Sequence, residues 1–83
     1  MRLFVAGSGE RSIRAVQTVK RICESDLAGR YRLEIIDIYK EPERAGRDQI
    51  IAIPTLIKEA PGIRRRIVGD MSQTALLKRR LEI

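Results

Sequence analysis

The chain has 83 residues, of which 43% are hydrophobic, and its seventeen basic and eleven acidic residues give a formal net charge of +6. This length and composition predict one small globular domain over residues 1–83 and exclude a disordered chain. The positive charge suits an anionic partner, either a nucleic acid or an acidic protein surface, and does not choose between them. No apolar run reaches transmembrane length, so we expect no membrane association.

The chain contains a single cysteine, Cys23, and no histidine. A lone cysteine allows no internal disulfide and fits a reducing compartment, so we expect a cytoplasmic protein. The lack of histidine removes the commonest metal ligand and the usual acid–base group. We therefore predict neither a metal site nor a cofactor.

The first half of the chain has the pattern of a strand–helix–strand unit. Arg2–Ala6 is a short apolar run that predicts a strand, and Ser8 is expected to cap the helix that follows. Arg32–Tyr39 predicts a second strand, and its branched aliphatic residues fall on both faces, as in a covered parallel strand. The helix between them is expected to bury five residues at helical spacing: Ile13, Val16, Val19, Ile22 and Cys23.

The run Ile50–Ile57 is aliphatic except for Pro54 and Thr55. Because proline opens a strand or lies at an edge, we expect a buried segment before it and a strand beginning at Thr55. A trans Ile53–Pro54 bond is the base expectation. The stretch is also similar to the segment of thioredoxin-like proteins in which a cis proline precedes a central strand. Both isomers are open at this point.

Three further elements complete the predicted order. Pro42 suits the first position of a short helix. Pro61-Gly62 matches a type II turn, after which Ile63–Val68 returns as the second strand of an antiparallel hairpin. A last helix follows, with Asp70 as its expected cap and Gln73 in the reciprocal position of a capping box.

The predicted fold is therefore α/β, with the thioredoxin-like order βαβαββα. Redox catalysis on such a scaffold needs a thiolate in the loop after the first strand. Here that loop is Gly7-Ser8-Gly9 and contains no sulfur, while Cys23 lies on the apolar face at the far end of the helix. The sequence therefore predicts that the protein is not an enzyme.

Two features of the sequence bear on binding. The first is Arg64-Arg65-Arg66 in the predicted hairpin, and the alternative to a binding role is that it forms a solvated strand face or protects an exposed edge. No aromatic residue is interleaved with these arginines, so a nucleic-acid partner is the least favoured interpretation. The second strand is expected at an edge of the sheet, where it can accept another protein's strand.

Six motifs lie in one register over nearly the whole chain: Leu3-Phe4-Val5-Ala6-Gly7, Ser12-Ile13-Arg14-Ala15, Ile36-Asp37-Ile38, Pro42, Ile53-Pro54-Thr55-Leu56 and Arg65-Arg66-Ile67-Val68-Gly69-Asp70. Through these motifs the sequence resembles the KaiB family of circadian clock proteins. The sensor domain of the clock kinase SasA has a similar layout, but Arg65–Asp70 followed by Met71-Ser72 is closer to KaiB.

The resemblance implies a function by binding. KaiB-like proteins bind the N-terminal ATPase ring of KaiC, compete there with SasA and help to sequester KaiA. The family also switches folds, between a tetrameric ground state with a rearranged C-terminal half and a monomeric thioredoxin-like state that binds. A KaiB-like paralogue, or a SasA-type sensor module, with another protein partner is the alternative.

Departures from the family pattern bear on the switch. Where typical members have glycine and aspartate near the end, this chain has Arg80 and Glu82, which are better helix formers. With Pro54, we interpret these residues as determinants of the switch. We expect the thioredoxin-like monomer, with residues 71–82 helical, to be the main state, and the KaiB ground-state fold to be the alternative.

Five residues are candidates for contact with a partner. Glu34 and Gln49 replace lysines typical of the family on surfaces implicated in partner contact, whereas Arg14 and Arg66 match basic positions. Arg65 adjoins Arg66 in the arginine run.

Overall fold

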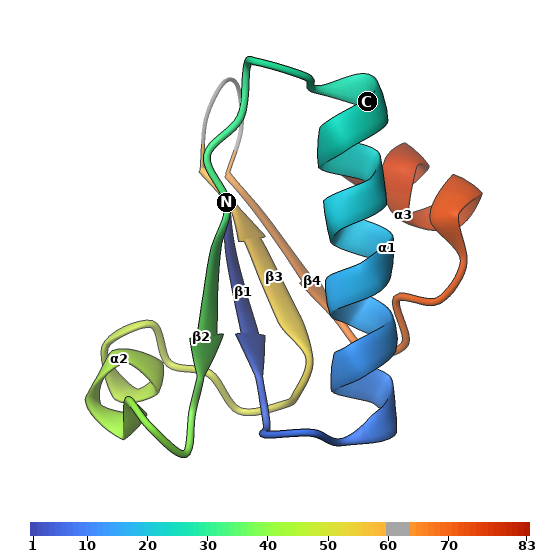
Figure 1. Ribbon diagram of the computed structural model, residues 1–83. Helices are drawn as coiled ribbons and strands as arrows, with labels where there is room; N and C mark the ends of the chain where they lie inside the picture. The colour runs from blue at the N-terminus through green and yellow to red at the C-terminus, as the bar shows by residue number, and fades with distance from the viewer. Residues whose placement is uncertain (60–63) are drawn as a thin grey trace.

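The computed structural model of the chain describes residues 1–59 and 64–83. It contains one sheet with the strand order β2-β1-β3-β4 (Figure 1). β1 is parallel to β2 and antiparallel to β3, and β3 is antiparallel to β4. The elements in chain order are β1 (Arg2–Val5), α1 (Glu10–Asp26), β2 (Glu34–Asp37), α2 (Pro42–Arg47), β3 (Thr55–Lys58), β4 (Arg65–Val68) and α3 (Thr74–Leu81).

This arrangement confirms the predicted thioredoxin-like order, with β2 at one edge and β4 at the other. The Ile53–Pro54 bond is cis, and β3 begins directly after it at Thr55. The predicted turn at Pro61-Gly62 lies outside the described residues.

The two faces of the sheet are covered unequally. α1 and α3 lie on one face, and α2 lies on the other, beside β2 (Figure 1). The first face holds the larger apolar core, in which β1, β3 and β4 pack against both long helices. Its buried members include Leu3, Val5, Leu56 and Ile67 from the strands and Ala15, Val19, Ile22, Met71, Leu77 and Leu81 from the helices and the segment before α3.

The second face has a smaller core. Phe4, Ile36 and Ile57 are fully buried there, each from a different strand. Partly buried residues from the segments on either side of α2 pack against them: Ile38, Ile50 and Ile53. α2 itself has no buried residue, so this face is covered by the segments before and after the helix.

α3 is held to the rest of the molecule by apolar and polar contacts together. Leu77 and Leu81 are 3% and 1% exposed, one turn apart on the face toward the sheet. At its C-terminal end, Lys78 Nζ lies 2.6 Å from Asp26 Oδ2 of α1, and Lys58 Nζ of β3 donates to the Leu81 carbonyl at 2.9 Å. A basic side chain at a helix C-terminus also complements the helix dipole.

The predicted helix caps are wrong, because the N-caps of α1 and α3 lie one and three residues after the predicted positions. Ser8 does not cap α1, whose N-cap is Gly9. Asp70 does not cap α3, because its Oδ1 accepts from the Ser72 amide at 2.9 Å in a turn that precedes the helix. Gln73 is the N-cap of α3 and makes no side-chain cap bond, so the predicted capping box does not form.

Three predicted burial assignments are also wrong. Ile13 is 46% exposed, because the buried face of α1 is turned toward Ser12, Ala15 and other small residues. β2 is buried on one face only, where Ile36 is fully buried while Ile35 is 38% exposed. Ile51 is 95% exposed, because the chain before Pro54 bends over the sheet without joining it as a strand.

The packing of α3 predicts opposite outcomes for two neighbouring leucines. Leu77→Ala removes a buried side chain and is expected to lower the free energy of unfolding by about 2–5 kcal/mol. Leu76→Ala, at a position 38% exposed on the same helix, should lower it by about 1 kcal/mol or less. Urea unfolding followed by circular dichroism measures both. Equal losses for the two variants would contradict this orientation of α3.

Candidate functional site

One row of residues crosses the second face of the sheet from edge to edge. In strand order it consists of Glu34, Arg2, Ile57 and Arg66, paired in register across β2, β1, β3 and β4. Side chains paired across adjacent strands lie on the same face. Three of the four are charged, and we call this set the charged row.

The charged row fastens α2 and the segment after it to the sheet. Arg44 of α2 makes a two-pronged ion pair with Glu34, in which Nη2 lies 2.7 Å from Oε1. At the far end, Arg66 donates to the carbonyl oxygens of Asp48 at 2.6 Å and Gln49 at 3.1 Å. Because these contacts reach both edge strands, the covering segment is attached across the width of the sheet.

Arg2 provides the attachment in the centre of the row. Its Nε lies 3.1 Å from Asp48 Oδ2, and its Nη2 lies 2.5 Å from Glu59 Oε1. The Nε group is buried and is not aligned for a hydrogen bond, so its attraction to Asp48 is electrostatic. Arg2 thus joins β1 to the residues that follow α2 and β3.

The ion pair at the β2 edge keeps both of its members charged. The hydrogen bonds from Arg44 hold the pKa of Glu34 below its usual value. The same hydrogen bonds raise the pKa of the Arg44 guanidinium. Sequence analysis missed Arg44 and Arg2 because their partners are set by strand register and by the position of α2. The one sequence feature that points to either residue is the position of the charged Arg2 at the start of an apolar strand.

The structure brings three of the five predicted contact residues to one face and places two elsewhere. Glu34 and Arg66 lie at opposite ends of the charged row, and Gln49 lies beside Arg66. Arg14 lies on α1, on the other side of the sheet, with its Nη2 2.5 Å from Glu10 Oε1. Arg65 points toward α3, where it pairs with Glu82.

The edge of β2 that faces away from β1 is a second candidate contact surface. Ile35 of β2 is 38% exposed, and Tyr39 just beyond the strand is 74% exposed. Asp37 Oδ1 accepts from the amides of Gly7 at 3.2 Å and Tyr39 at 2.9 Å, which joins the loops that follow β1 and β2. In the described part of the chain no strand pairs with β2 on the side away from β1. This edge can therefore accept an added strand.

The three predicted switch residues have different environments. Pro54 is fully buried, and Arg80 lies exposed in the last turn of α3. Glu82 lies outside the helix, at the C-cap, with a left-handed φ of 59°. Glu82 pairs with Arg65 at this position, and its role in the switch stays a prediction.

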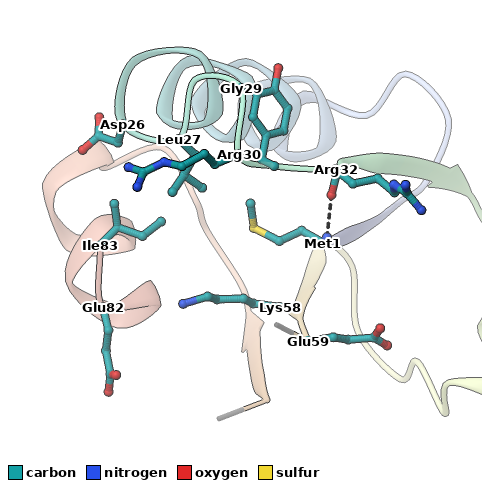
Figure 2. Close-up of a pocket in the computed structure, with 11 residues that line it drawn as sticks. Met1, Asp26, Leu27, Gly29, Arg30, Arg32, Lys58, Glu59, Glu82 and Ile83 are labelled. Atoms are coloured by element: carbon teal, nitrogen blue, oxygen red, sulfur yellow. Dashed lines mark hydrogen bonds between the residues drawn. The ribbon is translucent and has the colours of Figure 1, made fainter. Parts of the chain in front are cut away.

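A hollow of about 760 Å³ opens at the end of the sheet where both termini lie. Figure 2 shows Met1, Leu27 and Ile83 facing into it, with the Met1 amine donating to the Arg32 carbonyl at 2.6 Å. Two of the charged residues that line it, Asp26 and Lys58, bind α3. The groups around this hollow thus hold the C-terminal helix in place.

Two observations concern metal ligands and the single thiol in the described residues. They contain no cluster of three potential metal ligands. Cys23 is fully buried, and this burial raises the pKa of its thiol, which opposes formation of a thiolate. None of the helices in residues 1–59 and 64–83 has both the length and the apolar character needed to cross a membrane.

The Glu34–Arg44 pair predicts a specific dependence of stability on pH. Because the folded state lowers the pKa of Glu34 below 4.5, the pair contributes stability above that pH and loses it as the pH falls through the folded-state value. Glu34→Gln should therefore reduce the urea midpoint at neutral pH and match the parent protein in strong acid. Glu43→Gln is the control, because Glu43 lies in the first turn of α2, the helix that carries Arg44. A Glu34→Gln deficit that persists unchanged in acid would contradict the assignment.

Comparison with known proteins places the chain in a family. The KaiB domain family model matches residues 2–83. The chain is 45% identical over 74 residues to the circadian clock protein KaiB3 of Synechocystis sp., a match that covers 89% of this chain and 72% of that protein. It is 46% identical over 72 residues to the circadian clock oscillator proteins KaiB of Prochlorococcus marinus subsp. pastoris and Synechococcus elongatus, covering 87% of this chain and 67% and 71% of theirs. The chain belongs to the KaiB family of circadian clock proteins.

Proposed function

We propose that this protein is a non-catalytic clock regulator that binds the N-terminal ATPase ring of a KaiC-like protein. It competes there with SasA and helps to sequester KaiA. The observation that carries the proposal is the KaiB domain match over residues 2–83, on a chain with the thioredoxin-like order of elements. We further propose that residues 1–83 act as one domain in the cytoplasm.

The second face and the β2 edge are the proposed contact surface. Glu34, Gln49 and Arg66 lie on this face, and the polar backbone of β2 is available at its edge. A strand added at β2 would gain main-chain hydrogen bonds, while the neighbouring charges would select the partner. Arg14, on α1, is proposed as a separate contact on the opposite side of the sheet.

The two departures from the family pattern should affect binding unequally. The charge of Glu34 is paired with Arg44, so a partner meets a compensated ion pair at that position. Gln49 is exposed, and it holds Arg66 through its backbone carbonyl, which leaves its side chain free of that contact. The loss of the lysine charge at Gln49 is therefore expected to affect partner binding more than the change at Glu34.

We propose that the thioredoxin-like monomer is the main state of the chain. Arg80 supports it through its helix propensity, which exceeds that of glycine by up to about 1 kcal/mol. Glu82 supports it through the ion pair with Arg65. The alternative is a tetrameric ground state with a rearranged C-terminal half, and a two-state equilibrium of this kind is sensitive to small energy differences.

The experiment that tests the function is a binding assay with the isolated N-terminal ATPase ring of a cyanobacterial KaiC. Analytical size-exclusion chromatography is expected to show the chain bound to the ring and to show its displacement by the SasA sensor domain. The KaiC C-terminal domain is the control. A chain that never associates with the ring would contradict the proposal and would favour a KaiB-like paralogue with another protein partner.

Gln49→Lys tests the charge argument within that assay. Adding the lysine should raise the association rate with the ring and make it more sensitive to salt, because charges at an interface rim act mainly on the encounter. Glu24→Gln raises the net charge by the same amount at an exposed position near the C-terminal end of α1, ten residues away from Arg14. Equal acceleration by both variants would indicate a general effect of net charge and contradict a role for position 49.

A further inference from the structure

The sheet has a second free edge, at β4, whose outward backbone groups the proposed function does not use. Gly69 N donates to the Pro54 carbonyl at 3.2 Å, which fixes the phase of the antiparallel β3–β4 ladder. In such a ladder, residues alternate between pointing their backbone groups at the partner strand and pointing them away. The amides and carbonyls of Arg66 and Val68 therefore point away from β3, toward the open side of the sheet.

These outward groups have no other partner in the parts of the chain that the structure describes. β4 pairs with β3 alone there, and no backbone hydrogen bond from a loop reaches Arg66 or Val68. The side chain of Val68 is 44% exposed, and that of Arg66 is exposed. An exposed edge with unpaired donors and acceptors is a template for another strand.

The side chains along this edge specify the charge of an added strand. Arg64 and Arg66 lie two residues apart and so project to the same face. Arg66 donates to carbonyl oxygens, which leave its positive charge uncompensated, and Arg64 has no acidic partner among the described residues. Val68 follows on the same face, and the 95% exposed Ile51 lies two residues beyond Gln49, which contacts Arg66.

We propose that the β4 edge binds an extended acidic segment of a partner protein, which adds to the sheet as a fifth strand. The segment would place acidic side chains at alternate positions opposite Arg64 and Arg66 and an apolar side chain opposite Val68. A second copy of this chain is a poor occupant, because two β4 edges placed side by side would bring arginines against arginines. The added strand would lie at the opposite edge of the sheet from β2, and it would share Arg66 with the face proposed for the KaiC-like partner.

The test uses a synthetic peptide with alternating glutamate and threonine that ends in valine, and a control peptide with lysine in place of glutamate. NMR of the full chain should show slowed amide exchange at Arg66 and Val68 on addition of the acidic peptide. The amide of Ile67, which already faces β3, should change little. The lysine peptide should have no effect.

Variants at the edge separate main-chain pairing from general attraction. Val68→Pro removes the outward amide without removing a donor to β3 and is expected to abolish peptide binding, whereas Val68→Thr retains the amide and should bind. Arg64→Gln should weaken binding roughly two- to fivefold and flatten its salt dependence. Circular dichroism of each variant monitors the fold.

Three results would overturn the proposal. One is protection by the acidic peptide at β2 with none at β4. Another is equal binding of the lysine peptide. The third is binding of a single-stranded oligothymidylate with no binding of either peptide, which would assign the arginines to a nucleic acid. None of these results depends on whether the chain binds a KaiC-like ring.

Discussion

The docking of α3 against the first face of the sheet is the interaction on which the rest of the structure depends. β4 reaches the core through Ile67, and α3 covers that region with Leu77 and Leu81. A chain of this length buries only about 60–65% of its unfolded surface, so the loss of one apolar contact has a large effect on its stability. Polar contacts to α1, β3 and β4 hold the C-terminal end of the same helix. The position of α3 therefore depends on all three of these elements.

With α3 on the first face, the other surfaces of the sheet are available for recognition. The second face is covered by a short helix and a bent segment that the charged row attaches to the strands. Both edges carry unpaired backbone groups in the described residues, but their side chains differ. β2 has the exposed Ile35 and the Glu34–Arg44 ion pair, whereas the β4 edge has Arg64 and Arg66, which have no acidic partner among the described residues. The two edges of the sheet thus differ in the side chains that they present.

The order of elements could be predicted from the sequence because hydrophobic period and turn residues are local signals. Pro42, Pro54 and the strand runs marked their elements at positions that the structure confirms. Caps failed at Ser8 and Asp70 because several local hydrogen-bonding solutions compete at a helix end. The Glu34–Arg44 and Arg2–Asp48 pairs depend on strand register and on how α2 sits, so no spacing rule along the chain could predict them.

The most direct test of this account is an NMR measurement on the full, unmodified chain. Backbone chemical shifts should report helix over residues 74–81, and nuclear Overhauser effects should join the methyl groups of Leu77 and Leu81 to those of Val19 and Ile22 in the same apolar core. Extended shifts over residues 74–81, with cross-strand contacts in place of contacts to α1, would contradict it. That result would mean that α3 does not cover the sheet, and the surfaces proposed for binding would then lie elsewhere.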